Sequence, residues 1–429
     1  MVIPIYTYRQ YQKRQSTSSI GDYSNEREQV LKIIEEVRSK GDTALKKYTL
    51  QFDQADLDQL KVGAEEQKKA ASSVSEELIE AIKGAKKNIT RFHSHQLENS
   101  WWDNGPGWIA GQRYLPLQSV GAYIPGGTAA YPSSVLMTVI PAKVAGVKNV
   151  YLCTPPGSDG KINPVTLAAA AEAGASAVYK IGGAQAVAAL AYGTESVPAV
   201  QKIVGPGNIY VTLAKKEVFG RVGIDMLAGP SEIVIVADEY ADPAYLAADL
   251  LSQAEHDPLS RSILITPDQD LAQQVVNYLE EQIMTLPRKK IAEQSLQEQG
   301  AIIIVSGLDE AWSAVNEIAP EHLELQLENA WPCLDYIDSA GAVFIGPYSP
   351  ESLGDYWAGS NHVLPTAGAA RYASALGVSD FIKRSHVLCY TSEALNQSAS
   401  QIAALARAEG LEAHARAVLL RRRKNEPQG

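Results

Sequence analysis

Four of the seven histidines in the sequence stand next to carboxyl or amide side chains that can share chemistry with an imidazole. Gln253 and His256 are three residues apart at the end of an expected helix, so both side chains project from one face of it. Glu321 precedes His322 directly after a proline, and a carboxylate beside an imidazole offers two groups for proton transfer. Both pairs suit a catalytic or metal-binding site, although a histidine at a helix end or a surface Glu–His pair also explains them.

The other two of these histidines lie in segments that contain glycine. Asp355, Asn361 and His362 belong to one glycine-rich loop, and Glu409 and His414 flank an expected helix break. Turn-forming residues and a helix-ending glycine explain these segments equally well. Because zinc takes imidazole and carboxylate ligands readily, the four segments together form a candidate zinc site, in which glutamine is an unusual ligand.

Two short glycine motifs are candidates for binding phosphate. Gly126 and Gly127 follow an expected strand, and Gly205-Pro-Gly207-Asn208 precedes an expected helix, whose amino end attracts anions. No G-x-G-x-x-G motif follows a strand, so the usual dinucleotide signature is missing. Plain tight turns explain the glycines as well, and the residues alone leave both readings open.

Short apolar strands alternate with helices through the middle of the chain. This pattern predicts an α/β fold with two doubly wound, Rossmann-like domains built on parallel sheets, plus an N-terminal arm and a small helical C-terminal segment. His93 and His95 lie in a polar helical segment and are expected at the surface. The expected strands cover 148–153, 177–181, 201–204, 233–237, 262–266, 301–305 and 341–345, and the expected helices include 24–52, 75–97, 165–173, 184–192, 268–284 and a pair within 391–424.

The composition excludes several classes of protein. With 429 residues, 45% hydrophobic and 20% charged, the chain has ordinary globular values, and its net charge of −11 argues against a nucleic-acid binder. Three scattered cysteines are too few for a disulfide framework or a thiolate zinc site and fit a reducing cytosol. We find no apolar run that would span a membrane and no secretory signal at the start, so a cytoplasmic location is expected.

At these residues the sequence resembles the histidinol dehydrogenase family, whose members are zinc enzymes. The resemblance rests on an ordered set of motifs that runs from about residue 25 to 420. Each motif is modest alone, whereas the ordered set is specific. The motifs are V-G-A-Y-I-P-G-G at 120–127, G-A-Q-A at 183–186, V-G-P-G-N at 204–208, A-G-P-S-E at 228–232, Q-A-E-H at 253–256, A-P-E-H at 319–322, and the matching residues of 354–366 and 409–414.

The resemblance implies a role for each matching residue. It implies NAD and one zinc ion per subunit as cofactors, and a homodimer in which the partner chain contributes Glu409 and His414. The implied zinc ligands are Gln253, His256, Asp355 and His414; the acid/base residues are Glu321 and His322; the NAD site holds Tyr123, Gln185 and Asn208; and the substrate contacts are Ser231, His362 and Glu409 together with the zinc ligands and the acid/base pair.

The implied reaction is the oxidation of L-histidinol to L-histidine through L-histidinal with two NAD, the last step of histidine biosynthesis. We expect an arm at 1–23, a discontinuous domain of 24–119 and 233–375, a second domain of 120–232, and a segment of 376–429 that completes the partner's site. A zinc hydrolase with Glu321 as the base, or a zinc-stabilised assembly protein, are the rival interpretations. NADH production from histidinol separates the three.

Overall fold

The computed structural model describes residues 2–17, 23–126 and 130–422. They form two compact units, the first from the described parts of Met1–Gln96 and Leu117–Phe381, and the second from those of Leu97–Pro116 and Ile382–Gly429. Part of the expected N-terminal arm and Gly127 of the first glycine motif lie outside the described residues. No helix within the described ranges is both long and apolar enough to cross a membrane.

A six-stranded parallel sheet forms one half of the first unit. Its order is β1-β11-β10-β9-β12-β13, so the first strand of the chain lies at one edge, beside β11. Without β1, the order in chain sequence is 3-2-1-4-5, the doubly wound pattern expected from the alternation of strands and helices. The strands are β1 (Ile5–Thr7), β9 (Glu232–Ala237), β10 (Arg261–Thr266), β11 (Ala301–Ile304), β12 (His322–Gln326) and β13 (Ala342–Ile345).

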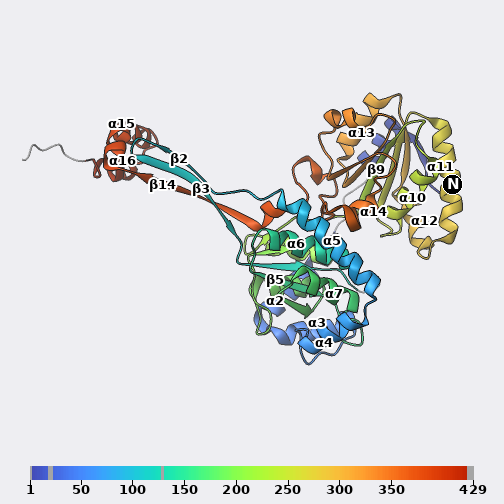
Figure 1. The fold of residues 1–429 in the computed structure, drawn as a ribbon, viewed down its shortest axis with the longest axis horizontal. Helices are drawn as coiled ribbons and strands as arrows, with labels where there is room; N and C mark the ends of the chain where they lie inside the picture. The colour runs from blue at the N-terminus through green and yellow to red at the C-terminus, as the bar shows by residue number, and fades with distance from the viewer. Residues whose placement is uncertain (1, 18–22, 127–129, 423–429) are drawn as a thin grey trace, which may run out of the picture. The chain divides into compact units, whose positions relative to one another are not determined.

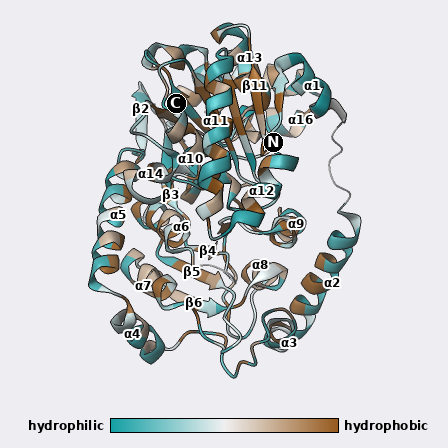
Figure 2. Cartoon of the chain, turned by 90° about the vertical axis from the view of Figure 1, so that its right-hand side faces the viewer, coloured by the Kyte–Doolittle hydropathy of each residue, from teal (hydrophilic) through white to brown (hydrophobic). Residues whose placement is uncertain are grey.

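Helices cover both faces of this sheet because successive strand residues point to opposite sides. Ile233 and Ile235 of β9 pack with α10, α11 and α12, whereas Val234 and Val236 pack toward α13 and α1. Figure 1 shows α10, α11 and α12 on one side of β9 and α13 on the other, and in Figure 2 hydrophilic turns of α11 lie in front of the hydrophobic strand β11. The helices are α1 (Tyr8–Thr17), α10 (Pro243–Ala254), α11 (Gln269–Gln282), α12 (Lys289–Glu298), α13 (Leu308–Ile318) and the short α14 (Glu351–Leu353).

A five-stranded parallel sheet forms the other half of the first unit. Its order, β6-β5-β4-β7-β8, is again 3-2-1-4-5. The expectation of two doubly wound parallel sheets is therefore confirmed. The strands are β4 (Ser119–Tyr123), β5 (Asn149–Thr154), β6 (Ala177–Lys180), β7 (Lys202–Val204) and β8 (Gly223–Ile224), and the helices between them are α6 (Pro132–Val144), α7 (Pro164–Ala173), α8 (Gly183–Tyr192) and α9 (Ile209–Val218).

The N-terminal helices pack elsewhere than the expected domain boundaries place them. Residues 24–119 were assigned with 233–375, but α2 and α3 share a core with α8 and α9, and α4 and α5 contact α7 and α6. The short β1, also assigned to an arm, is paired into the six-stranded sheet. His93 of α5 is fully buried rather than at the surface, with Nδ1 2.8 Å from Gln96 Oε1. The helices are α2 (Ser24–Lys40), α3 (Asp42–Asp53), α4 (Ala64–Ser73) and α5 (Glu76–Ser94).

The second unit is a three-stranded antiparallel sheet with two helices. β3 lies between β2 and β14 and pairs with β14 from Pro116–Ile382 to Trp108–Tyr390. The two helices expected within 391–424 are present, and Gly410 between them has a φ of +76°. The strands, which were not expected, extend this segment to residues 101–116. The elements are β2 (Trp101–Gly105), β3 (Trp108–Pro116), β14 (Ile382–Tyr390), α15 (Ser392–Ala408) and α16 (Glu412–Leu419).

Candidate active site

Glu321 and His322, the expected acid/base pair, lie at the amino end of the six-stranded sheet. Glu321 directly precedes β12 and His322 is its first residue, and the parallel register places His322 opposite Ile233 of β9. Glu321 and His322 are only 6% and 3% exposed. The sequence ends α13 abruptly at Ala319, which has a left-handed φ of +51°, and Pro320 then directs the chain into the strand. The pair therefore sits on rigid backbone rather than in a surface turn.

The hydrogen bonding of His322 fixes its tautomer. Nδ1 lies 3.0 Å from the carbonyl oxygen of Glu232, the first residue of β9. Because a carbonyl only accepts, Nδ1 carries the proton and donates it, which leaves a lone pair on Nε2. Nε2 is buried and has no hydrogen-bond partner among the described residues. Burial lowers the pKa of His322 to about 4, against the opposing charge of Asp355, so the ring is neutral near pH 7 and free to accept a proton at Nε2.

Glu321 is held by the same residue of β9. Its Oε2 accepts a hydrogen bond of 2.9 Å from the backbone N–H of Glu232 and lies 3.7 Å from His322 Nδ1. Burial raises the pKa of Glu321 well above its ordinary value, and the hydrogen bond from Glu232 opposes that shift. A carboxyl group with a raised pKa is suited to taking and returning a proton near neutral pH.

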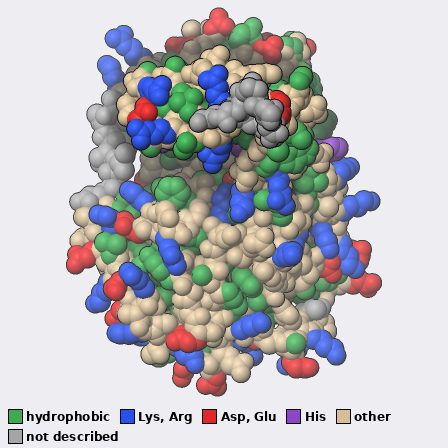
Figure 3. Space-filling view, turned by 90° about the vertical axis from the view of Figure 1, so that its left-hand side faces the viewer, with side chains coloured by type: hydrophobic (Ala, Val, Ile, Leu, Met, Phe, Trp, Pro, Cys, Tyr) green, Lys and Arg blue, Asp and Glu red, His purple; other side chains and the backbone are tan. Residues whose placement is uncertain are grey.

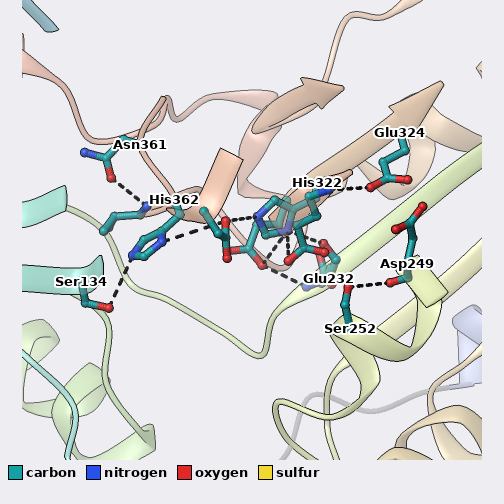
Figure 4. A network of polar contacts seen from close by, with 12 residues as sticks. Ser134, Glu232, Asp249, Ser252, His322, Glu324, Asn361 and His362 are labelled. Carbon is teal, nitrogen blue, oxygen red and sulfur yellow. Dashed lines mark hydrogen bonds and ion pairs between the residues drawn. The ribbon is translucent and has the colours of Figure 1, made fainter. Parts of the chain in front are cut away.

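Asp355 lies between His322 and His362. Its Oδ1 lies 3.8 Å from His322 Nε2 and 4.0 Å from His362 Nδ1, and His362 Nε2 is 3.4 Å from Ser134 Oγ (Figure 4). Asp355 belongs to a π-helical turn, Gly354–Ala358, a feature often found at functional sites. Gly359 ends this turn at a φ of +102°, where a Cβ would lie 2.5 Å from the carbonyl oxygen of Asn88. The glycines of this loop therefore have a steric function.

Gln253 and His256 lie at the end of α10, and the charge of the same carboxylate acts on His256. Gln253 is fully buried in the last turn of α10, and His256 follows the helix end. His256 is exposed as a residue, yet enough protein surrounds its ring for desolvation to lower its pKa, and the charges of Asp355 and then Glu255 oppose that shift. The charge of His256 also acts on His322. The structure thus brings His256, His322, Asp355 and His362 into one electrostatic cluster.

Glu351 is a site residue that the sequence analysis missed. Donor atoms of His322, Glu351 and Asp355 all lie within 4.8 Å of one another, a grouping that suits a metal ion. Glu351 Oε1 is 3.6 Å from His322 Nδ1, and burial raises the pKa of Glu351 well above its ordinary value. The sequence feature that could have identified Glu351 is its spacing of four residues from Asp355. Imidazole nitrogen and carboxylate oxygen are donor types that zinc takes.

A second group of expected site residues lies at the carboxyl end of the five-stranded sheet. Tyr123 ends β4, the loop of Gly205 follows β7, and these neighbouring strands are where the strand order reverses. The Tyr123 hydroxyl accepts a hydrogen bond of 3.1 Å from Gly183 N–H, and Gln185 is 1% exposed with no partner for Oε1 among the described residues. Asn208 is exposed and caps α9 by accepting 3.2 Å from Val211 N–H.

A cavity of about 380 Å³ opens at the same edge of the sheet. It lies beyond the ends of β4 and β5 and is lined by loop residues on both sides, including Pro125, Gly126, Thr154, Pro155 and Asn163. Ligands of doubly wound sheets bind at this crevice, outside the carboxyl ends of the strands and at the reversal of strand order. The cavity lies at this carboxyl edge on the β5 side of β4, next to the reversal between β4 and β7 rather than in it.

A buried ion pair fixes the Gly205 turn, which the sequence analysis did not foresee. Lys215 and Asp225 have 2% and 1% exposed side chains and form an ion pair with each other. Lys215 Nζ donates 3.1 Å to the Gly205 carbonyl, and Asp225 accepts 2.7 Å from Gly205 N–H. Gly205 has a φ of +109°, and a Cβ there would collide with the carbonyl oxygen of Tyr123. Both backbone polar groups of Gly205 are thus hydrogen-bonded to the side chains of the buried ion pair.

The remaining expected residues are less informative by themselves. Ser231 is half-buried just before β9, and its carbonyl accepts 2.9 Å from Arg261 N–H. Glu409 and His414 belong to the second unit, where both are exposed, at the end of α15 and in α16. Basic and acidic side chains are interspersed over the face that Figure 3 shows.

Comparison with known proteins identifies the family. The sequence profile for histidinol dehydrogenase matches residues 16–422. Histidinol dehydrogenase of Geobacillus kaustophilus is 54% identical over 402 residues, covering 94% of this chain and 95% of the relative, and that of Halalkalibacterium halodurans is 55% identical over 390 residues, covering 91% and 92%. The crystal structure of histidinol dehydrogenase from Elizabethkingia anophelis superposes with a TM-score of 0.92 at 41% identity, covering 98% of both chains. With its fold, its buried Glu–His pair and these relatives, the chain belongs to the histidinol dehydrogenase family.

Proposed function

We propose that this chain oxidises L-histidinol to L-histidine through L-histidinal, using two NAD and one zinc ion per subunit, as the last step of histidine biosynthesis in the cytoplasm. The observation that carries the proposal is the state of His322. Its Nδ1 donates to the Glu232 carbonyl, its buried Nε2 has no hydrogen-bond partner within the described part of the chain, and a second proton-transfer group, Glu321, is adjacent in sequence.

The first oxidation needs a base at the alcohol. Hydride leaves the carbon more easily when the hydroxyl proton is removed at the same time, and the Nε2 lone pair of neutral His322 is available to take it. NAD, when bound, supplies the hydride acceptor in both oxidations. The product of this step is the aldehyde, which a water-poor pocket protects from side reactions.

The second oxidation needs a hydrated aldehyde. Glu321 takes a proton from water as the water oxygen attacks the aldehyde carbon, and it returns a proton to the former carbonyl oxygen. His322 then accepts a hydroxyl proton of the hydrate while the second hydride leaves. The raised pKa of Glu321 and the lowered pKa of His322 suit these two roles, because neither group is locked in its charged form.

Zinc binding is proposed for Gln253, His256 and Asp355 together with the partner subunit's His414. Zinc, when bound, would orient the amino and imidazole nitrogens of the substrate. Ser231 and His362 would line the substrate position, and the partner subunit's Glu409 would complete it. In a two-fold dimer this arrangement gives two equivalent shared sites. The electrostatic proximity of His256 and Asp355 supports the proposal, and the ligand Gln253 itself rests on the family resemblance.

NAD binding is proposed for Tyr123, Gln185 and Asn208. They lie around the crevice where the strand order of the five-stranded sheet reverses, beside the 380 Å³ cavity. The buried Oε1 of Gln185, for which the described residues supply no hydrogen-bond partner, offers an acceptor for a cofactor N–H or hydroxyl. Burial raises the pKa of Tyr123 to about 12, so its hydroxyl remains protonated at neutral pH.

The deciding experiment measures NADH formed from L-histidinol. We expect two NADH for each histidinol consumed, loss of activity with a strong chelator, and recovery with zinc. One NADH with accumulating histidinal would contradict the role of Glu321 in hydration. Absence of NADH under all conditions would overturn the proposal.

A further inference from the structure

We infer that Tyr11, Arg261 and Glu232 form a positioning relay through which the N-terminal helix α1 holds the catalytic pair in register. The inference rests on the proposed function of Glu321 and His322. It assigns a positioning role to α1, part of the segment that was expected to be an arm. The proposed reaction gives none of the three residues a proton to transfer.

Glu232 holds both catalytic side chains with its own backbone. Its N–H donates to Glu321 Oε2 at 2.9 Å, and its carbonyl accepts from His322 Nδ1 at 3.0 Å. Both bonds belong to one residue at the first position of β9, so a small displacement of that residue moves the two groups together. The position of Glu232 therefore sets both the direction and the tautomer of the base (Figure 4).

Arg261 holds Glu232 from the neighbouring strand. It is the first residue of β10 and lies directly opposite Glu232 in the parallel register. Its Nη1 donates 2.9 Å to Glu232 Oε1, and its backbone N–H donates 2.9 Å to the carbonyl of Ser231. The amino end of β9 is thus attached to β10 by a side-chain bond and a backbone bond at consecutive residues.

Tyr11 fixes the orientation of the guanidinium. Its hydroxyl oxygen accepts 2.8 Å from Arg261 Nη2, while Nη1 serves Glu232, so the planar fork of the arginine is held at two points. Tyr11 is 3% exposed and packs in the core that includes Val234 and Val236 of β9. The match to the family profile begins at residue 16, so Tyr11 lies outside that match whereas Arg261 lies within it.

The test compares two conservative substitutions on the same helix. Tyr11→Phe keeps the packed ring and removes the oxygen that holds Arg261. Tyr8→Phe makes the same change three residues earlier, where the hydroxyl contacts Glu317 and, among the described residues, donates or accepts no hydrogen bond with Arg261 or Glu232. We expect Tyr11→Phe to lower kcat about threefold to tenfold in both half-reactions, because sub-ångström displacement of a base is costly, while KM for histidinol and NAD changes less than twofold. Tyr8→Phe should leave kcat unchanged.

A second comparison removes the charge of the relay. Arg261→Lys keeps a cation beside Glu232 but cannot hold Tyr11 as well, whereas Arg261→Gln loses the charge. We expect kcat to fall in the order wild type, Arg261→Lys, Arg261→Gln. Equal kcat losses in Tyr11→Phe and Tyr8→Phe, or losses that merely follow thermal stability, would overturn the relay.

A spectroscopic readout separates this inference from the proposed function. In protein labelled with ¹⁵N-histidine, the Nδ1 signal of His322, identified by its absence in His322→Asn, should shift in Tyr11→Phe and stay in place in Tyr8→Phe. If the Nδ1 signal shifts in Tyr11→Phe but the wild-type protein forms no NADH from histidinol, the proposed function is refuted and the relay is retained. An unchanged signal in Tyr11→Phe would refute the relay even in a fully active enzyme.

Discussion

Replacing Asp225 should show that the buried ion pair beneath the Gly205 turn positions the cofactor loop. Asp225→Leu leaves Lys215 charged in the interior and removes the acceptor of two backbone N–H groups, those of Gly205 and Met226, both at 2.7 Å. Breaking a buried pair on one side costs about 3–5 kcal/mol. We therefore expect the free energy of unfolding to fall by about 4 kcal/mol in the single variant.

The double variant Lys215→Met with Asp225→Leu separates stability from positioning. An apolar pair of similar volume is often as stable as the ion pair it replaces, so the double variant should return to within about 1–2 kcal/mol of the wild type. Gly205 nevertheless loses both of its polar partners. Loss of one such hydrogen bond corresponds to about a tenfold weaker affinity, so we expect KM for NAD to rise about tenfold, with kcat at saturating NAD and KM for histidinol unchanged.

Urea unfolding followed by circular dichroism measures the stability, and initial rates over a range of NAD concentrations measure the loop effect. Lys202→Met is the matched control. Lys202 begins β7, the strand directly before Gly205, but its ammonium group pairs with Asp380 at 3.0 Å and not with Gly205. It should leave KM for NAD unchanged. A folded double variant that retains the wild-type KM for NAD would refute the positioning role of the pair.

Three further predictions concern the catalytic pair, the dimer and the pH dependence of stability. Glu321→Gln should impair oxidation of supplied histidinal more than that of histidinol, whereas His322→Asn should slow both; equal losses for Glu321→Gln would refute this division. Asp355→Ala and His414→Ala homodimers should be inactive, but refolding them together should restore roughly a quarter of the activity, since about half of the dimers are mixed and carry one intact site; no recovery would show that the sites are not shared. Burial raises the pKa of Asp53 to about 6, so its ionisation destabilises the fold as pH rises from about 4 to 6, and the cost persists above that range. Because this group is partly exposed, Asp53→Asn should raise the free energy of unfolding by only about 1 kcal/mol at pH 8 and by nothing at pH 4, and an equal gain at both values would contradict the cause given.

The alternation of strands and helices was readable because each strand of a parallel sheet is a short apolar run. Ile233–Ala237 and Ala301–Ile304 are of this kind in the six-stranded sheet, and Asn149–Thr154 is of this kind in the five-stranded sheet. β2 is almost entirely exposed, and β3 is mostly half-buried; neither has the apolar alternation that would have predicted a strand. β1 is only three residues long and is a strand through its pairing with β11, a contact that local sequence does not encode.

The site was readable to the extent that residue type carries the chemistry. Glu321 and His322 were singled out because adjacent acid and base groups are informative wherever they occur. Glu232 and Glu351 were not, since their roles come from backbone groups and from neighbours that are distant in sequence. The packing of α2 to α5 against the five-stranded sheet could not be predicted either, because the sequence of an amphipathic helix does not specify which sheet the helix covers.

The pairing of β3 with β14 has a consequence for folding during synthesis. Pro116 pairs with Ile382, so β3 leaves the ribosome roughly 270 residues before its main partner, a delay of about 15 to 55 s at ~5–20 residues per second. During that interval Trp101, Trp102 and Ile109 belong to an incomplete sheet with an open edge. Such an edge invites pairing with other chains. We therefore expect chains that stall or end before β14 to aggregate more readily than completed chains.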